Sequence, residues 1–274
     1  MNSQPKLFPG HLGLFFLLAY LFSWSFFIPL ALQGLGWITG IPNQLHFLGA
    51  FGPLLSAFVV TISTEGFPGF KRWSAQLTHW KTGWKWWLPT ALSPGLVFIM
   101  TCVLMGLFSG DWRPINRFGF VSEIPTIPWY LGWLLMLGTF GLGEEAGWRG
   151  FALPRLQQKY DARISSLILG LVWAFWHFPV FFYGYPASLL GIGIFLVSIL
   201  SGSAFLTWLY NTTGGSVLAA AIWHGTYNAA VAGADGPISA AVTGSVILTV
   251  VIAARIYGPD SFSFRPRYTL RGSK

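Results

Sequence analysis

Residues 141–151 read GLGEEAGWRGF and follow residues 129–140, an apolar run without a charged side chain. Two adjacent carboxylates and the guanidinium of Arg149 therefore stand at the end of a predicted membrane helix. Ionisable groups at membrane depth are costly, so they usually have a partner or a function. Because Glu145 and Arg149 are four residues apart, a helix places them on one face, in the order that favours an ion pair.

The neighbouring carboxylate, Glu144, is not neutralised by that pair, because it points about 100° away from Glu145 on a regular helix. We expect Glu144 to face an interior cavity. The alternative interpretation is a cytoplasmic helix end whose charges simply reach the membrane surface.

The composition is that of an integral membrane protein. Of the 274 residues, 54% are apolar and 9% are charged, whereas soluble domains carry about 25% charged residues. The net charge of +8 would suggest nucleic acid in a soluble protein, but here the basic residues cluster in alternate loops, so we expect no nucleic-acid partner. The single cysteine, Cys102, excludes an internal disulfide. No HExxH or Cys/His zinc pattern occurs.

Apolar runs of about 20 residues are candidate membrane helices. They predict an all-α, multi-pass protein with about eight transmembrane helices in a single membrane domain, residues 1–274. The predicted spans are 12–32, 45–63, 86–108, 129–151, 164–183, 188–210, 216–232 and 238–256.

The charges of the connecting segments predict the orientation. Basic residues are in excess in the second loop, the fourth loop and the tail: Lys71, Arg72, Lys81 and Lys85, then Arg149, Arg155, Lys159 and Arg163, then Arg255, Arg265, Arg267, Arg271 and Lys274. Since basic loops stay on the cytoplasmic side, both termini are predicted in the cytoplasm and the protein in the cell membrane. Residues 67–87 mix basic and aromatic side chains, which suits an anchor in the lipid headgroups; the alternative is a surface helix that gathers substrate.

Two later spans also carry polar groups. His177 lies in the sequence WAFWHFP, where Pro179 cannot donate a backbone hydrogen bond, so the helix should kink beside a cavity. His224 and Asn228 are four residues apart in HGTYN and share a helix face. Each histidine alone could be a core residue bonded between helices. Small residues in these spans, however, allow close helix packing that brings the groups together.

This set of residue types predicts attack of water on a carbonyl group within the membrane. A buried carboxylate can act as a general base, and histidine can share or donate the proton. Histidine and asparagine can also donate hydrogen bonds to a developing oxyanion. No serine or cysteine stands in a nucleophile motif.

Three motifs resemble one family. EEAGWR, residues 144–149, matches the EExxxR motif of the CAAX-protease and bacteriocin-processing (CPBP, or Abi) family of intramembrane proteases. Residues 173–177 resemble its FxxxH motif, with Trp173 in place of phenylalanine, and residues 224–228 resemble its HxxxN motif. We expect the tryptophan to touch no polar group. The chain resembles bacterial-type members over residues 128–232, the expected catalytic core.

The resemblance implies an intramembrane endopeptidase whose site opens to the cytosol. Its substrate would be a membrane-associated peptide or protein, either prenylated and CAAX-type or leader- and bacteriocin-type. By position, the resemblance assigns roles to six residues: water activation to Glu144 and His177, oxyanion stabilisation to His224 and Asn228, and support of the site to Glu145 and Arg149.

The cofactor and two rival functions follow from the same residues. The family has been described both as metal-dependent and as glutamate-dependent; two histidines and a carboxylate could hold Zn²⁺. Since these ligands would come from three different helices, we expect no requirement for metal. The rivals are a proton-coupled transporter, in which Glu144, His177 and His224 form a relay, and a non-catalytic membrane scaffold or immunity protein.

Overall fold

The protein is an all-α bundle. The computed structural model describes residues 9–234 and 236–270, and these residues contain helices and connecting segments without a β-strand. The predicted fold class is therefore confirmed. Four charged residues counted in the sequence, Lys6, Asp235, Arg271 and Lys274, lie outside the described residues.

The helices follow the predicted spans in order. The first group is α1 (Pro9–Gly34), α2 (Leu45–Gly49), α3 (Gly52–Leu77), α4 (Trp84–Ser109) and the 3₁₀ helix η1 (Arg113–Arg117). The motif stretch comprises α5 (Trp129–Met136), η2 (Leu137–Glu144), α6 (Glu145–Gly147), η3 (Trp148–Ala152) and α7 (Leu153–Leu156). The remaining helices are α8 (Ala162–Trp176), the 3₁₀ helix η4 (Phe178–Phe182), α9 (Leu189–Thr212), α10 (Val217–Val231) and α11 (Gly236–Tyr257).

Five helical stretches of the described chain are long and apolar enough to cross a membrane. They are residues 11–34, 45–77, 84–109, 189–212 and 236–257. The motif stretch, α8 and α10 occupy the three other predicted spans, and α8 and α10 have only 15 residues each. The structure thus supports a multi-pass membrane protein, and the number eight stays a prediction.

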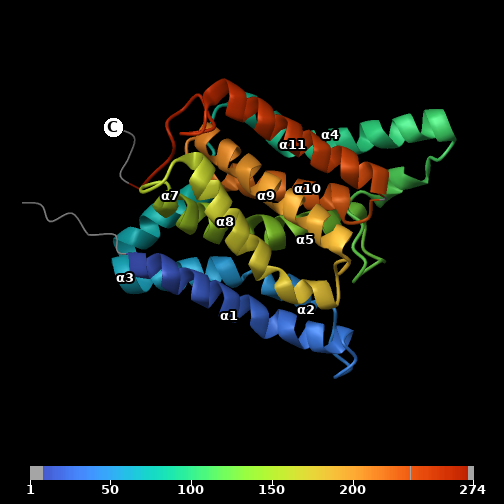
Figure 1. Cartoon of the computed structure of the whole chain (residues 1–274), viewed down its shortest axis with the longest axis horizontal. Coiled ribbons are helices and arrows are strands. Elements are labelled where there is room, and N and C mark those ends of the chain that lie inside the picture. Colours follow the sequence, from blue (N-terminus) through green and yellow to red (C-terminus); the bar gives the residue numbers. More distant parts are fainter. Residues whose placement is uncertain (1–8, 235, 271–274) are drawn as a thin grey trace, which may run out of the picture.

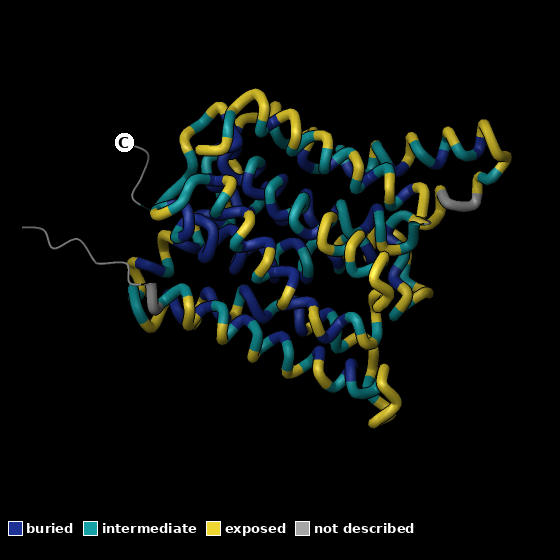
Figure 2. Tube along the Cα trace, in the orientation of Figure 1, coloured by how far each residue is buried: buried dark blue, intermediate teal, exposed yellow. Residues whose placement is uncertain are grey.

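The motif stretch lies at the centre of the bundle. Helices α1 and α3 form one side and α4 and α11 the other, with α5, α8, α9 and α10 between them (Figure 1). Helix α10 packs against α4 and η2, and α8 packs against α9. Burial agrees with this central position. Residues 143–154 are all buried, without a break (Figure 2).

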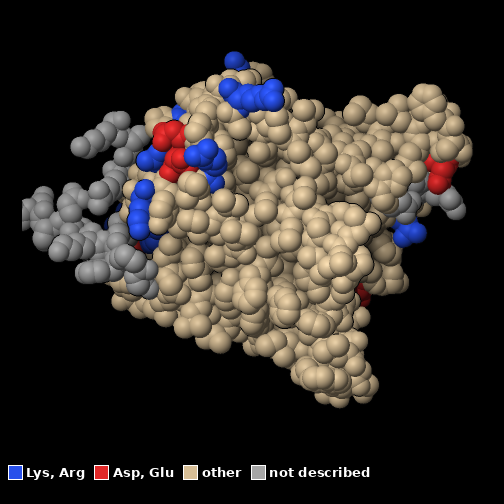
Figure 3. Space-filling view, viewed as in Figure 1, with Lys and Arg blue, Asp and Glu red and all other residues tan. Residues whose placement is uncertain are grey.

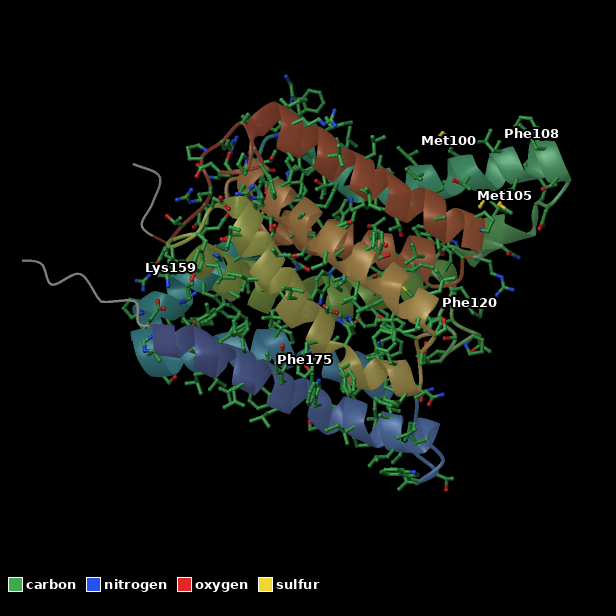
Figure 4. All side chains as sticks on the ribbon, viewed as in Figure 1. Met100, Met105, Phe108, Phe120, Lys159 and Phe175 are labelled. Atoms are coloured by element: carbon green, nitrogen blue, oxygen red, sulfur yellow. The ribbon has the colours of Figure 1, made fainter. Side chains whose placement is uncertain are left out.

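Charged side chains gather at one end of the molecule. Figure 3 shows most of the visible Lys and Arg side chains at the left end of the molecule. The surface between the left and right ends carries little charge. Helix α1 begins at this end, and the segment that follows α11 returns to it (Figure 1). Lys159 lies there too, whereas Phe108 lies at the opposite end (Figure 4). Both described ends of the chain are therefore on one side, and the assignment of that side to the cytoplasm stays a prediction.

Glycines set the distance between the central helices. A Cβ atom at Gly141 would meet the carbonyl oxygen of Ala221 on α10, and one at Gly225 would meet the backbone of Leu137. The backbones of η2 and α10 therefore touch directly, as the small residues in both spans predict.

The fifth predicted span differs from its prediction. The sequence predicted a kinked helix through residue 183, but α8 ends at Trp176 and continues as the 3₁₀ helix η4. Pro179 cannot donate the next helical hydrogen bond. The backbone N–H of His177 instead donates to the carbonyl oxygen of Ala174 at 3.2 Å, which tightens the last turn and stops the helix.

The segment 67–87, predicted as a surface anchor, is only partly exposed. Phe67, Trp80 and Trp84 are largely exposed, as an anchor requires. Trp73 and Gln76 are buried and face the motif stretch. The anchor interpretation stays a prediction for the exposed aromatic residues, and it does not apply to Trp73 and Gln76, which pack inside the bundle.

A buried polar network fastens the C-terminal segment to the bundle. Asn211 Nδ2 donates to Gln157 Oε1 at 2.8 Å and to the Ser261 carbonyl oxygen at 2.9 Å, and its Oδ1 accepts from the Tyr268 backbone N–H at 3.0 Å. Asn211 begins an Asn-Thr-Thr sequence that would match a glycosylation site. Its side chain is fully buried and bonded, so the amide is committed to the fold.

We expect Asn211→Ala to release residues 259–270 from the bundle. The substitution leaves the donors and acceptors of Gln157, Ser261 and Tyr268 without their partner, at a cost of about 1–3 kcal/mol for each buried group. Hydrogen exchange of the Tyr268 amide should accelerate, and the melting temperature should fall. Asn43→Ala, at an exposed position, is the matched control. Unchanged exchange at Tyr268 would show that the network does not hold this segment.

Candidate active site

The motif stretch is not the regular α-helix that the sequence predicted. Its segments η2 and η3 are π-helical, and only the three residues of α6 between them are α-helical. The wider turns leave carbonyl groups to be satisfied from outside, and α3 supplies the donors. Trp73 Nε1 donates to the carbonyl oxygen of Ala146 at 2.9 Å, and Gln76 Nε2 to that of Gly150 at 3.5 Å. Short π-helical turns occur frequently at functional sites.

Glu145 contacts two side chains that donate hydrogen bonds to it. Its Oε1 accepts from Arg149 Nη1 at 2.9 Å, and both side chains are fully buried. The predicted ion pair is therefore confirmed. The same oxygen lies 2.8 Å from Nδ1 of His224, which reaches it from α10. This second contact joins two helices, and the i,i+4 spacing that predicted the first contact gives no sign of it.

The contact with Glu145 determines which ring nitrogen of His224 carries a hydrogen. A carboxylate oxygen only accepts, so Nδ1 of His224 carries the hydrogen. Nε2 then has a lone pair in the neutral ring and a hydrogen in the imidazolium. His224 can therefore donate a hydrogen bond from Nε2 only in its charged form.

Glu144 has a different partner from Glu145. Its Oε2 accepts from the indole Nε1–H of Trp173 at 2.7 Å, in a buried contact between η2 and α8. The expectation that Trp173 touches no polar group is wrong. Phenylalanine at this position could not make the bond, because it has no donor. Oε1 of Glu144 has no hydrogen-bond partner among residues 9–234 and 236–270.

The end of α8 sets the orientation of His177. The N–H of His177 bonds to Ala174, so the carbonyl oxygen of Trp173 is open, and Nδ1 of the His177 ring lies 2.8 Å from it. Because a carbonyl oxygen only accepts, Nδ1 carries the hydrogen and Nε2 of the neutral ring is free to take a proton. The ring is buried among aromatic side chains, with Trp176 edge-on at 4.7 Å between centroids and Phe195 at 5.5 Å.

The structure brings five of the six predicted site residues together around Trp173. Its indole bonds Glu144, and its ring lies 4.9 Å from the Arg149 guanidinium carbon and 5.4 Å from the His224 ring centroid. The sixth residue, Asn228, follows His224 on α10 and is half-buried. Asn228 makes no side-chain hydrogen bond within the described residues, and its role stays a prediction, as do the roles of the other five.

Comparisons with known proteins match the part of the chain that carries the three motifs. A family model described as type II CAAX prenyl endopeptidase Rce1-like matches residues 126–230, which contain all three motifs. A protein named CAAX prenyl protease 2 from Methanococcus maripaludis (strain S2) is 34% identical over 139 residues. That alignment covers 47% of this chain and 49% of the relative, so the chain spans about half the length of the curated relative it matches. Together with the three motifs and the all-α membrane fold, these similarities support membership of the CPBP family over the part of the chain that carries the motifs.

Proposed function

We propose that this protein is an intramembrane endopeptidase that uses Glu144 to activate water against a peptide bond. The substrate class is a membrane-associated protein or peptide, with a prenylated CAAX-type C-terminus as the first candidate. The family match and the name of the Methanococcus relative support this choice.

The observation that carries the proposal is the different surroundings of two adjacent carboxylates. Glu145 is occupied by Arg149 and His224 through one oxygen. Glu144 is held through Oε2 alone by Trp173, a neutral donor. Oε2 of Glu145 is also without a hydrogen-bond partner, so the partner of the bonded oxygen distinguishes the two carboxylates. The neutral donor Trp173 fixes the orientation of Glu144 and leaves it able to accept a proton, whereas Arg149 neutralises Glu145.

The proposed reaction uses only side chains of this chain. Water bound at Oε1 of Glu144 gives one proton to the carboxylate while its oxygen forms a bond to the substrate carbonyl carbon. The carbonyl oxygen becomes an oxyanion, which accepts hydrogen bonds from Nε2 of charged His224 and from the Asn228 amide. The carbon–nitrogen bond then breaks, and Glu144 returns its proton to the leaving nitrogen. His177 accepts from the same water through Nε2 and orients it.

The available donors do not fit a zinc site. The described residues contain no group of three or more His, Cys, Asp or Glu side chains that could hold a metal ion. Glu145 Oε1 already accepts from two partners, so this oxygen is not free for a metal ion. We therefore propose a route without metal, in which cleavage persists when the protein is treated with a zinc chelator.

Cleavage profiling with purified protein tests the proposal. The protein, in detergent or nanodiscs, receives a farnesylated CAAX-type peptide, the same peptide without the lipid, and a leader-type peptide, and the products are identified by mass spectrometry. We expect cleavage by the wild type and none by Glu144→Ala. Absence of cleavage by well-folded wild type on every peptide would contradict the protease assignment. A preference for the leader-type peptide would change the substrate class.

A further inference from the structure

Trp173 contacts the proposed base and three other predicted site residues. Its Nε1–H bonds Glu144, its ring faces Arg149 and stands nearly perpendicular to the ring of His224, and its backbone carbonyl accepts from His177. No other described side chain donates a hydrogen bond to Glu144. We propose that Trp173 is a positioning residue, which holds the Glu144 carboxylate in its reactive orientation and keeps it apart from Arg149. This inference rests on the proposed function of Glu144.

The hydrogen bond determines which oxygen of Glu144 can meet water. A carboxylate side chain has several rotatable bonds, and this one is buried, so it is not surrounded by bulk water. Nε1–H of Trp173 fixes Oε2 at 2.7 Å, a length typical of a strong bond to a charged acceptor. Oε1 is then the oxygen that remains for a water molecule.

The indole ring also contacts Arg149, the ion-pair partner of the other carboxylate, Glu145. Arg149 lies with its guanidinium carbon 4.9 Å from the ring centroid while it donates to Glu145. A guanidinium against an aromatic face is stabilised in place. Trp173 thus directs Arg149 to Glu145 and presents a neutral donor to Glu144. A carboxylate bonded directly to arginine would be a weaker base, so this separation favours proton transfer.

The decisive variant is Trp173→Phe, which keeps an aromatic ring and removes only the donor and part of the volume. Loss of one hydrogen bond to a charged group corresponds to roughly a 10–100-fold effect. We expect kcat to fall by that factor while KM changes less than about twofold, because substrate binding does not involve the bond. The matched control is Trp148→Phe. Trp148 is equally buried in the motif stretch, but its Nε1 has no hydrogen-bond partner among the described residues.

A measurement that needs no activity separates this inference from the protease proposal. The indole ¹⁵N–¹H resonance of Trp173 is identified as the signal missing from Trp173→Phe. In wild-type protein it should appear at the low-field position of a donor bonded to a carboxylate, and Glu144→Gln should move it towards the positions of the other indoles. No shift in Glu144→Gln, or equal kcat in wild type and Trp173→Phe, would overturn the inference. Wild type that shows the shift and cleaves nothing would contradict the protease function and leave the Trp173–Glu144 bond established.

Discussion

Glu144→Gln is expected to abolish hydrolysis while the protein stays folded. The amide retains the shape of the side chain, and its carbonyl oxygen can still accept from Trp173 Nε1, so the buried contact at 2.7 Å survives in a neutral form. An amide cannot take a proton from water. General-base catalysis contributes about 10²–10⁴-fold to rate, and we expect a loss of that size or greater in kcat/KM. Peptide cleavage and melting temperature, measured on the same detergent preparation, check both parts.

A control glutamate makes this result specific. Glu123 lies in the segment before α5 and makes no side-chain hydrogen bond to a predicted site residue within the described chain, and Glu123→Gln should cleave like the wild type. If Glu144→Gln retained activity, Glu144 would not be the base. If it unfolded, the carboxylate would be a structural group, and the position of the base would have to be sought elsewhere.

The local spacing in the sequence was enough to predict part of the site. Apolar runs gave the helices in their order, because the bilayer sets the length of a span. The four-residue separation of Glu145 and Arg149 predicted their ion pair, because neighbours on a helix face are fixed by helix geometry. That pair formed although the flanking turns are π-helical.

Contacts between different helices could not be predicted from the spacing of residues in the sequence. The bonds from Trp173 to Glu144 and from His224 to Glu145 depend on the rotation and depth of separate helices, which packing determines. Trp173 was expected to be a neutral replacement for phenylalanine, since a pattern of residue types says nothing about where an indole N–H points. The end of α8 could have been found from Pro179, because proline removes the donor that a continuing helix needs.

Glu145→Gln is expected to destabilise the fold, whereas Glu144→Gln leaves it intact. The change leaves Arg149 charged and fully buried without a charged partner, and breaking a buried pair costs roughly 3–5 kcal/mol. For a protein of this size that corresponds to an apparent melting temperature about 6–20 °C lower. Arg149→Ala should behave alike. The exposed pair of Arg267 and Asp260 is the matched control, since Asp260→Asn should cost only about 0–1 kcal/mol.

The double variant Glu145→Gln with Arg149→Leu separates stability from catalysis. Removing both charges takes away the unpaired ion, so the melting temperature should recover in part. The new side-chain amide would still accept a neutral hydrogen bond from Nδ1 of His224, but it would no longer stabilise the imidazolium that donates from Nε2. We therefore expect the double variant to be stable and inactive. Recovery of cleavage along with stability would show that Glu145 serves the fold alone, and a stable, inactive Glu145→Gln beside an active Glu144→Gln would exchange the roles of the two glutamates.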